Sequence, residues 1–203
     1  MDKQKLIQEA EARLAVQDPI LGRLISSQTP IVYAPRDDYF FSLARAITSQ
    51  QISVASAAAI FSRLESVTAM DPAVVAQLTS EQTTHIGLSK QKTNYLRDLA
   101  AHFVENPSIY NHLDARTDEE IVTELTAIKG IGTWTAEMFL MFTLARLDVF
   151  APDDVGLQRA IRNLYAHGNT LSKSELEEIA DHWRPYRTVA CWHLWQSLDN
   201  TPS

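Results

Sequence analysis

Apolar residues recur at helical spacing along almost the whole chain, and this periodicity restricts the fold more than any other feature of the sequence. The clearest predicted faces are Phe40, Leu43, Ala44 and Ile47; Val54, Ala57, Ala58 and Phe61; and Leu96, Leu99, Ala100 and Phe103. The chain shows no pair of alternating, strand-like segments, and only six of its 203 residues are glycine. We therefore predict an all-α fold of about nine to eleven helices joined by short turns.

Capping signals support several predicted helix starts. Asp71 directly precedes Pro72, which is the order of an N-cap and a first helical residue. Thr117 and Ser172 are each followed three residues later by Glu, the spacing of a capping box. The acidic segments that follow Thr117 and Ser172 also suit the positive end of a helix dipole.

The composition excludes several classes of protein. The single cysteine, Cys191, excludes an internal disulfide, a multi-cysteine zinc site and a four-cysteine iron–sulfur cluster. The longest uncharged apolar run, residues 138–145, is far shorter than the ~18 residues that span a membrane. The N-terminal segment lacks the apolar core of a signal peptide, so we expect a cytoplasmic protein without a membrane partner.

The acidic balance of the chain discourages nucleic-acid binding at first sight. The net charge is −7, from 18 basic and 25 acidic residues. However, residues 118–124 and 175–181 together hold eight acids and no Lys or Arg, and the rest of the chain carries +1. Because both acidic segments lie at helix starts, the net charge does not exclude DNA as a partner.

Two glycines lie close together in the segment 125–136, LTAIKGIGTWTA. A predicted helix ends before Gly130-Ile131-Gly132, and a second helix begins at Thr133. Glycines at a helix end allow positive φ angles, and the free N–H groups of the next helix start can bind a phosphate. On spacing alone, an ordinary αα-hairpin with glycine caps is an equally good interpretation.

A second segment, Pro152-Asp153-Asp154, precedes the predicted helix Val155–Tyr165. Asp153 can cap this helix, and Asp154 then lies in the first turn, where the helix dipole stabilises an ionised carboxylate. A plain helix N-terminus accounts for both acids without any catalytic role.

These segments resemble the helix-hairpin-helix (HhH-GPD) superfamily of DNA glycosylases. Residues 49–55 and 183–195 resemble its DNA-3-methyladenine glycosylase II branch, and the resemblance extends from about residue 40 to residue 195. It implies a two-lobed fold, with one lobe at residues 38–146 and the other at residues 1–37 and 147–203. It also implies that Asp154, the counterpart of the family's essential aspartate, lies in the cleft between the lobes, and that Asp153 is its structural neighbour.

The resemblance assigns roles to the hairpin and the loops around it. The backbone amides of Gly130, Gly132 and Thr133 would hold a DNA phosphate. The side chain of Gln51 would fill the gap left by an extruded base, although on composition alone a solvated loop glutamine is an equally good interpretation. Apart from the resemblance, the charges of Lys90 and Lys92, which follow the turn at Gly87, predict contacts with phosphates, although a solvated basic face is the alternative. A monovalent cation, Na⁺ or K⁺, would bind the backbone carbonyls of Thr126, Ile128 and Ile131.

The residue types indicate which reaction such an enzyme performs. Bifunctional members carry a lysine where this chain has Trp134, so the Schiff-base lyase route is closed and hydrolysis remains. The cysteine cluster of the iron–sulfur branch is missing. Trp134, Trp195 and Met138 would form the base pocket, because indole faces attract the cationic bases 3-methyladenine and 7-methylguanine. Such a base leaves as a neutral molecule, so one carboxylate can suffice where glycosidases use two.

Packing in the core is the alternative for each tryptophan, and we prefer it for Trp192 and also for His193. The sequence thus predicts a monomeric, monofunctional base-excision-repair glycosylase that removes alkylated purines from double-stranded DNA. The alternatives are a uracil or mismatch glycosylase of the same fold and a non-catalytic helix-hairpin-helix module that binds DNA.

Overall fold

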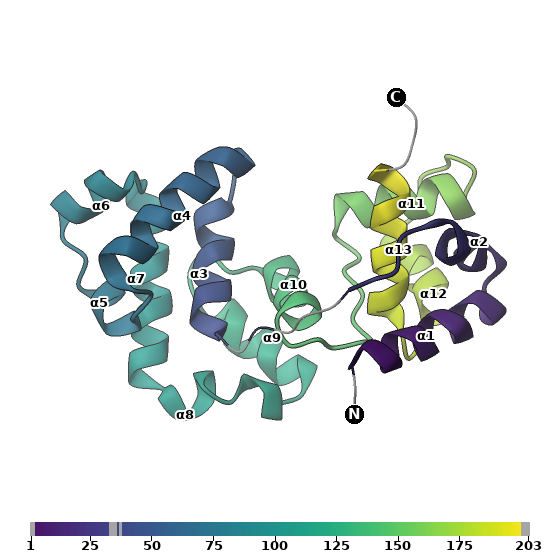
Figure 1. Cartoon of the computed structure of the whole chain (residues 1–203), viewed down its shortest axis with the longest axis horizontal. Coiled ribbons are helices and arrows are strands. Elements are labelled where there is room, and N and C mark those ends of the chain that lie inside the picture. The colour runs from purple at the N-terminus through teal and green to yellow at the C-terminus, as the bar shows by residue number, and fades with distance from the viewer. Residues whose placement is uncertain (1–2, 33–35, 37, 200–203) are drawn as a thin grey trace. The chain divides into compact units, whose positions relative to one another are not determined.

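The computed structural model describes residues 3–32, 36 and 38–199, and every regular element in these residues is a helix (Figure 1). The elements are α1 (Lys3–Gln17), α2 (Pro19–Ser27), α3 (Tyr39–Ser49), α4 (Val54–Thr68), α5 (Pro72–Ala76), α6 (Ser80–Ile86), α7 (Lys90–Glu105), α8 (Pro107–Tyr110), the 3₁₀ turn η1 (Leu113–Ala115), α9 (Asp118–Thr126), α10 (Thr133–Phe142), α11 (Val155–Tyr165), α12 (Lys173–Asp181) and α13 (Arg187–Asp199). The all-α prediction is confirmed. The predicted helix number is too low for these residues, because elements such as α5 and α8 have five and four residues, too few for a periodic pattern.

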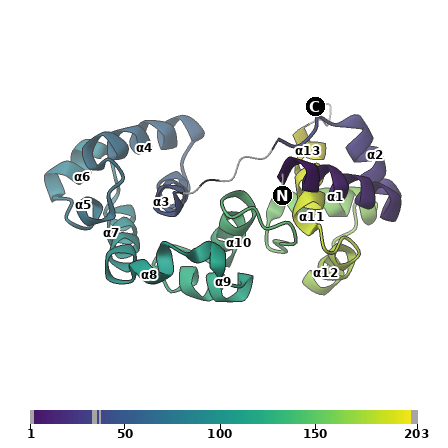
Figure 2. The same cartoon turned by 60° about the horizontal axis from the view of Figure 1, so that its bottom comes forward.

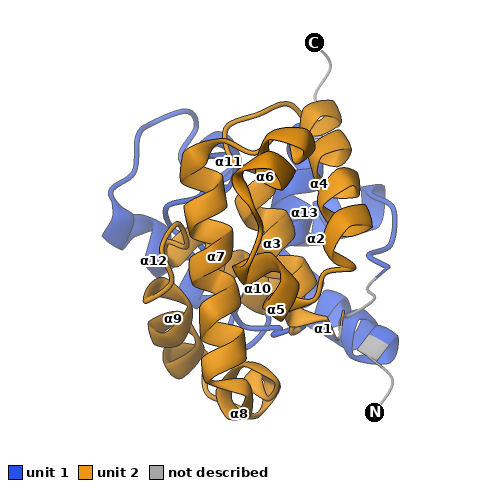
Figure 3. Ribbon diagram, turned by 90° about the vertical axis from the view of Figure 1, so that its left-hand side faces the viewer, with its two compact units in different colours: residues 1–35, 145–203 blue, residues 36–144 orange. Residues whose placement is uncertain are grey.

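The chain divides into two compact units (Figure 3). Unit 1 consists of residues 1–35 and 145–203, and unit 2 of residues 36–144. The limits of unit 2 differ by two residues at each end from the predicted lobe at 38–146. The predicted hairpin lies wholly in unit 2, and the predicted catalytic aspartate lies in unit 1.

The core of unit 2 forms where α3 packs against α7. All the apolar residues predicted for the inner faces of these two helices are buried, and the rings of Phe40 and Phe103 meet edge to face at 5.2 Å between centroids. The predicted face of α4 is partly wrong. Ala57 and Phe61 are buried, but Val54 is 87% exposed and Ala58 is also exposed, and burial continues instead through Leu64.

The core of unit 1 is organised around α13, which packs against α1, α2 and α11 (Figure 2). Val189, Ala190 and Leu194 of α13 are buried. Gly22 lets α2 approach α1 closely, since a Cβ atom at this position would lie 2.8 Å from the carbonyl oxygen of Ala15.

The predicted caps are present in both units. Asp71 caps α5 with Pro72 as the first helical residue, and Thr117 and Ser172 form complete capping boxes at α9 and α12. Among the residues that the structure describes, no helix combines the length and the hydrophobicity that crossing a membrane requires.

Candidate active site and DNA-binding elements

The glycine turn between α9 and α10 has the backbone conformation that its sequence predicts. Gly130 has a φ of 87°, and a Cβ atom there would lie 2.2 Å from the ring of Tyr95 on α7. Both the backbone angle and the packed ring therefore require glycine. Gly132 is the N-cap of α10 and, as a glycine, has no side chain to cap the helix that begins at Thr133.

Two side chains from neighbouring segments anchor this turn. Asp98 on α7 accepts hydrogen bonds from the backbone N–H of Lys129 at 2.9 Å and from its Nζ at 2.8 Å. Gln50, which ends α3, donates from Nε2 to the carbonyl oxygen of Gly130 at 2.9 Å. Burial raises the pKa of Asp98, but the hydrogen bonds and the charge of Lys129 outweigh it and lower the pKa below its ordinary value. The sequence analysis missed the structural role of Gln50 and Asp98, because both act across the fold.

The loop that carries Gln51 is attached to the hairpin through its neighbour Gln50. Gln51 is exposed and has a φ of 56°, in the left-handed region that few residues other than glycine adopt. Gln50, Gln51, Lys92, Tyr95 and Gly130 all line a cavity of about 370 Å³. Residues predicted to contact DNA thus lie together in unit 2, around the hairpin turn.

The two predicted basic contacts differ in their surroundings. Lys90 is exposed as the first residue of α7. Lys92 is half-buried and donates from Nζ to the carbonyl oxygen of Thr48 at 2.7 Å, near the C-terminal end of α3. Burial lowers the pKa of Lys92 below its ordinary value. Lys92 therefore helps to join α7 to α3, whereas Lys90 is accessible to a phosphate.

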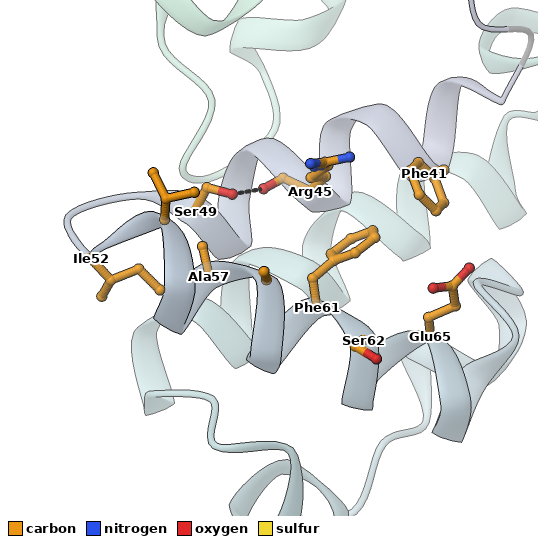
Figure 4. A pocket seen from close by; sticks show the side chains of 10 residues that line it. Phe41, Arg45, Ser49, Ile52, Ala57, Phe61, Ser62 and Glu65 are labelled. Atoms are coloured by element: carbon orange, nitrogen blue, oxygen red, sulfur yellow. Dashed lines mark hydrogen bonds between the residues drawn. The ribbon is translucent and has the colours of Figure 1, made fainter.

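A second cavity of about 370 Å³ lies along α3 and α4 (Figure 4). Phe41 and Phe61 meet edge to face at 4.8 Å between ring centroids, and the guanidinium of Arg45 lies 6.0 Å from the ring of Phe61. None of the residues predicted to bind DNA or a base lines this cavity.

The predicted catalytic aspartate lies at the start of α11 in unit 1. Asp154, rather than Asp153, is the N-cap of this helix, and its Oδ1 accepts a hydrogen bond from the backbone N–H of Leu157 at 2.8 Å. The predicted cap assignment was therefore wrong by one residue. Asp153 is exposed and pairs with Lys173 on α12, at 2.9 Å between Oδ2 and Nζ.

Trp195 on α13 contacts the aspartate directly. Its Nε1 donates to the same Oδ1 of Asp154 at 2.9 Å. Gly156 provides the space for this contact, since a Cβ atom there would lie 3.0 Å from Oδ1 of Asp154 and 3.2 Å from Nε1 of Trp195. The role of Gly156 was missed, because the sequence does not show that α13 lies against the first turn of α11.

The other two residues predicted for the base pocket lie on α10 in unit 2. Trp134 is 47% exposed and Met138, one turn later, is half-buried. Phe142, a further turn along the same face, is 42% exposed. The spacing of four residues could have indicated this apolar stripe from the sequence. Its joint action with Trp195 and Asp154 in one cleft stays a prediction.

The prediction that His193 is a core residue is confirmed. His193 is 1% exposed, and its ring nitrogens lie 2.7 Å from Oε1 of Gln28 and 3.1 Å from Oε1 of Glu11. Burial lowers its pKa below the ordinary value, and the negative charge of Glu11 opposes this effect only in part. Trp192 is half-buried.

The carbonyls predicted to bind a cation follow the C-terminal end of α9. Thr126 is the last residue of α9, so its carbonyl lies at the negative end of the helix dipole. The carbonyl oxygen of Ile128 accepts the N–H of Ile131 at 3.1 Å and has a second lone pair. These oxygen donors fit a hard monovalent cation. No group of three or more His, Cys, Asp or Glu side chains that could hold a metal ion occurs within residues 3–32, 36 and 38–199.

The sequence and the fold match a known family. Residues 44–185 match the sequence model of the family described as HhH-GPD superfamily base excision DNA repair protein. The match covers well over half of the chain, so the protein belongs to the HhH-GPD superfamily.

Relatives within this superfamily carry related names. The chain is 28% identical to the alkylbase DNA glycosidase-like protein mag2 of Schizosaccharomyces pombe, over 97% of this chain and 96% of that protein. It is 32% identical to the DNA-3-methyladenine glycosylase of Saccharomyces cerevisiae, over 79% of this chain and 67% of that protein.

Solved structures agree with this assignment. A DNA-3-methyladenine glycosidase from Bacillus halodurans superimposes with a TM-score of 0.84 at 36% identity, over 94% of this chain and 89% of that one. The 3-methyladenine DNA glycosylase Mag1 of S. pombe, solved in complex with abasic DNA, gives a TM-score of 0.80 at 28% identity, over 94% and 97%. The helix-hairpin-helix glycosylase fold predicted from the sequence is confirmed.

Proposed function

We propose that this protein is a base-excision-repair DNA glycosylase that hydrolyses the N-glycosidic bond of alkylated purines in double-stranded DNA. The observation that carries the proposal is the carboxylate of Asp154, which is held at the N-terminus of α11 by donors from Leu157 and Trp195. Leu157 lies on α11 and Trp195 on α13, so donors from two helices hold one oxygen of this carboxylate. The similarity to named alkylbase and 3-methyladenine glycosylases supports the same conclusion.

In the proposed reaction, Asp154 stabilises positive charge that develops on the sugar as the base departs. An ionised carboxylate is the form that this step needs. Alkylation at N3 of adenine or N7 of guanine has already made the base a good leaving group. A single carboxylate therefore suffices, and water completes the hydrolysis and leaves an abasic site.

The base itself would be recognised by stacking. Trp134 is 47% exposed on α10, so its indole is accessible to a planar ligand. A cation over an indole face gains roughly 0.5–2 kcal/mol, depending on how far water is excluded. Since a tryptophan occupies this position, no lysine is available there to form a Schiff base, which supports a monofunctional enzyme without lyase activity.

The hairpin and the loop beside it would hold the DNA. The N-terminus of α10 at Thr133 can bind a phosphate, and the exposed Gln51 can enter the space left by the extruded base. The bond between Gln50 and Gly130 would keep these two elements in register. A monovalent cation at the carbonyls of Thr126, Ile128 and Ile131 would neutralise the end of α9 and bring positive charge near the phosphate.

The test is release of bases from defined DNA substrates. Wild-type protein should release 3-methyladenine and 7-methylguanine from methylated duplex DNA, and should nick the strand only after separate alkaline treatment of the abasic site. Asp154→Asn should bind abasic DNA as wild type does and release almost no base. Strand cleavage without alkali would disprove the monofunctional assignment.

The same assay distinguishes the alternative functions. Duplexes that contain uracil or a mismatched thymine, run in parallel, would identify a glycosylase for neutral bases if only these are cleaved. Wild-type protein that binds abasic DNA tightly but releases no base from any substrate would instead be a non-catalytic DNA-binding module.

A further inference from the structure

The contact between Trp195 and Asp154 has a geometry that differs from that of a stacking platform. The indole edge, through Nε1, points at Oδ1 of Asp154 at 2.9 Å. The backbone N–H of Leu157 reaches the same oxygen at 2.8 Å. Two donors that come from different helices and converge on one carboxylate oxygen restrict the rotation of the carboxylate about its side-chain torsions.

Gly156 makes this convergence possible. A Cβ atom at this position would lie 3.2 Å from both Cδ1 and Nε1 of Trp195 and 3.0 Å from Oδ1 of Asp154. Contacts this short require one of the partners to move. A methyl group at this position would therefore crowd both the donor and the acceptor of this hydrogen bond.

We propose that Trp195 is a positioning residue, which orients the carboxylate of Asp154 through its indole N–H and requires Gly156 for that contact. The inference rests on the proposed function, in which Asp154 stabilises the charge that develops on the sugar. It reassigns Trp195, which the sequence analysis placed in the base pocket as a stacking surface. The reaction needs this positioning, because the carboxylate must meet a charge that develops at one point in space.

A similar tryptophan–aspartate pair in unit 1, Trp183 and Asp18, provides a control that separates positioning of a catalytic group from ordinary stabilisation of the fold. Trp183 donates from Nε1 to Oδ2 of Asp18 at 3.0 Å, and the hydroxyl of Tyr165 donates to the same oxygen at 2.8 Å. Asp18 caps α2 as Asp154 caps α11. Removal of the indole donor to Asp18 is therefore the same chemical change as removal of the Trp195 donor to Asp154, but at a carboxylate for which no catalytic role is proposed.

The central experiment compares Trp195→Phe with Tyr165→Phe and Trp183→Phe. Phenylalanine keeps an aromatic ring and loses the donor, so a stacking role predicts that Trp195→Phe remains active. Positioning predicts that the single-turnover rate of 3-methyladenine release falls roughly 10- to 100-fold while the dissociation constant for abasic DNA changes little. Gly156→Ala, which keeps both side chains, should show the same division between rate and binding.

The control variants should show the opposite pattern. Tyr165→Phe and Trp183→Phe should lower the melting temperature by roughly 2–8 °C and leave the single-turnover rate near that of wild type. Tyr165→Phe removes only a hydroxyl, so it remains a usable control if Trp183→Phe proves too unstable to purify. Rates that fall equally in the control variants and in Trp195→Phe would overturn the positioning role.

A spectroscopic measurement tests the contact independently of catalysis. The indole N–H resonance of Trp195, assigned by its loss in Trp195→Phe, should shift in Asp154→Asn and in Gly156→Ala, whereas the resonance of Trp183 should not. An unchanged Trp195 resonance would disprove the contact, and a wild-type rate in Trp195→Phe would disprove its role. If wild-type protein releases no base, the proposed function fails, and the resonance still shows whether the contact exists.

Discussion

Two aspartates in unit 1, Asp18 and Asp154, share a local design but differ in how their oxygens are used. Each caps a helix, and each accepts a hydrogen bond from a tryptophan indole. At Asp18, Oδ1 accepts the backbone N–H groups of Ile20 and Leu21, while Oδ2 accepts two side-chain donors. At Asp154, the backbone donor and the indole converge on Oδ1.

This difference shows that an aspartate at a helix start says little about its role. Asp18 joins α2 to Tyr165 and to Trp183, which is fully buried, so its bonds hold the core of unit 1 together. At Asp154, a backbone N–H and an indole N–H instead share one oxygen, with a glycine beside the contact. Two predictions test this contrast and a third tests another buried carboxylate pair of unit 1, from the largest expected effect to the smallest.

The largest effect should come from removing the charge at each aspartate in turn. Asp154→Asn should reduce the single-turnover rate of base release by roughly 10²–10³-fold or more, because the charge that develops on the sugar loses its counterion. Asp18→Asn should retain a rate close to that of wild type, measured on the same methylated duplex. A comparable loss of rate in Asp18→Asn would remove the distinction between the two sites.

Truncation of each aspartate to alanine should affect the free energy of unfolding more at Asp18 than at Asp154, the opposite of the order expected for the rate. Asp18→Ala should lower the free energy of unfolding by about 3 kcal/mol, since it removes a cap and leaves the tyrosine hydroxyl and the indole N–H without their acceptor. Asp154→Ala should lower it by less, about 1 kcal/mol for the lost cap, because Trp195 is only half-buried and its indole N–H can bind water instead. Urea denaturation of both variants measures the difference, and equal losses would contradict the contrast.

The smallest expected effect is a pH dependence of stability at His193, which pairs with the carboxylate of Glu11 in unit 1. His193 pairs with Glu11 in place of an indole, and burial lowers the pKa of His193 in the folded protein. The unfolded chain therefore binds a proton more readily, so stability is present above the ordinary histidine pKa of about 6.5 and is lost as the pH falls below it.

Denaturation of wild type and His193→Gln at pH 7 and pH 5 measures this contribution. The variant should lose less stability over this interval than wild type, even if it is less stable at both pH values. The same loss in both proteins would show that the titration of His193 does not contribute. The indole N–H groups of Trp183 and Trp195, which donate to Asp18 and Asp154, do not titrate between pH 5 and pH 7.

Local patterns predicted much of the fold. The buried faces of α3 and α7, the caps at Asp71 and Thr117 and the bounds of α11 followed from periodicity and capping rules, because these depend on residues a few positions apart. The same rules failed at Val54 and at Asp153. At Val54, burial depended on whether another element covers the first turn of α4. At Asp153, the cap depended on which of two neighbouring carboxylates reaches the N–H groups of α11.

The sequence by itself determined the helical fold class and the glycine turn at Gly130, because short-range chemistry carries both. Its resemblance to the glycosylase family, rather than local chemistry, selected Asp154 as the candidate carboxylate. Only the tertiary structure decided what surrounds them. Asp98 and Gln50 anchor the glycine turn from distant segments, and Trp195 reaches Asp154 across 41 positions of the chain. Such contacts depend on how helices pack, and packing depends on the fit of whole surfaces rather than on spacing along the chain.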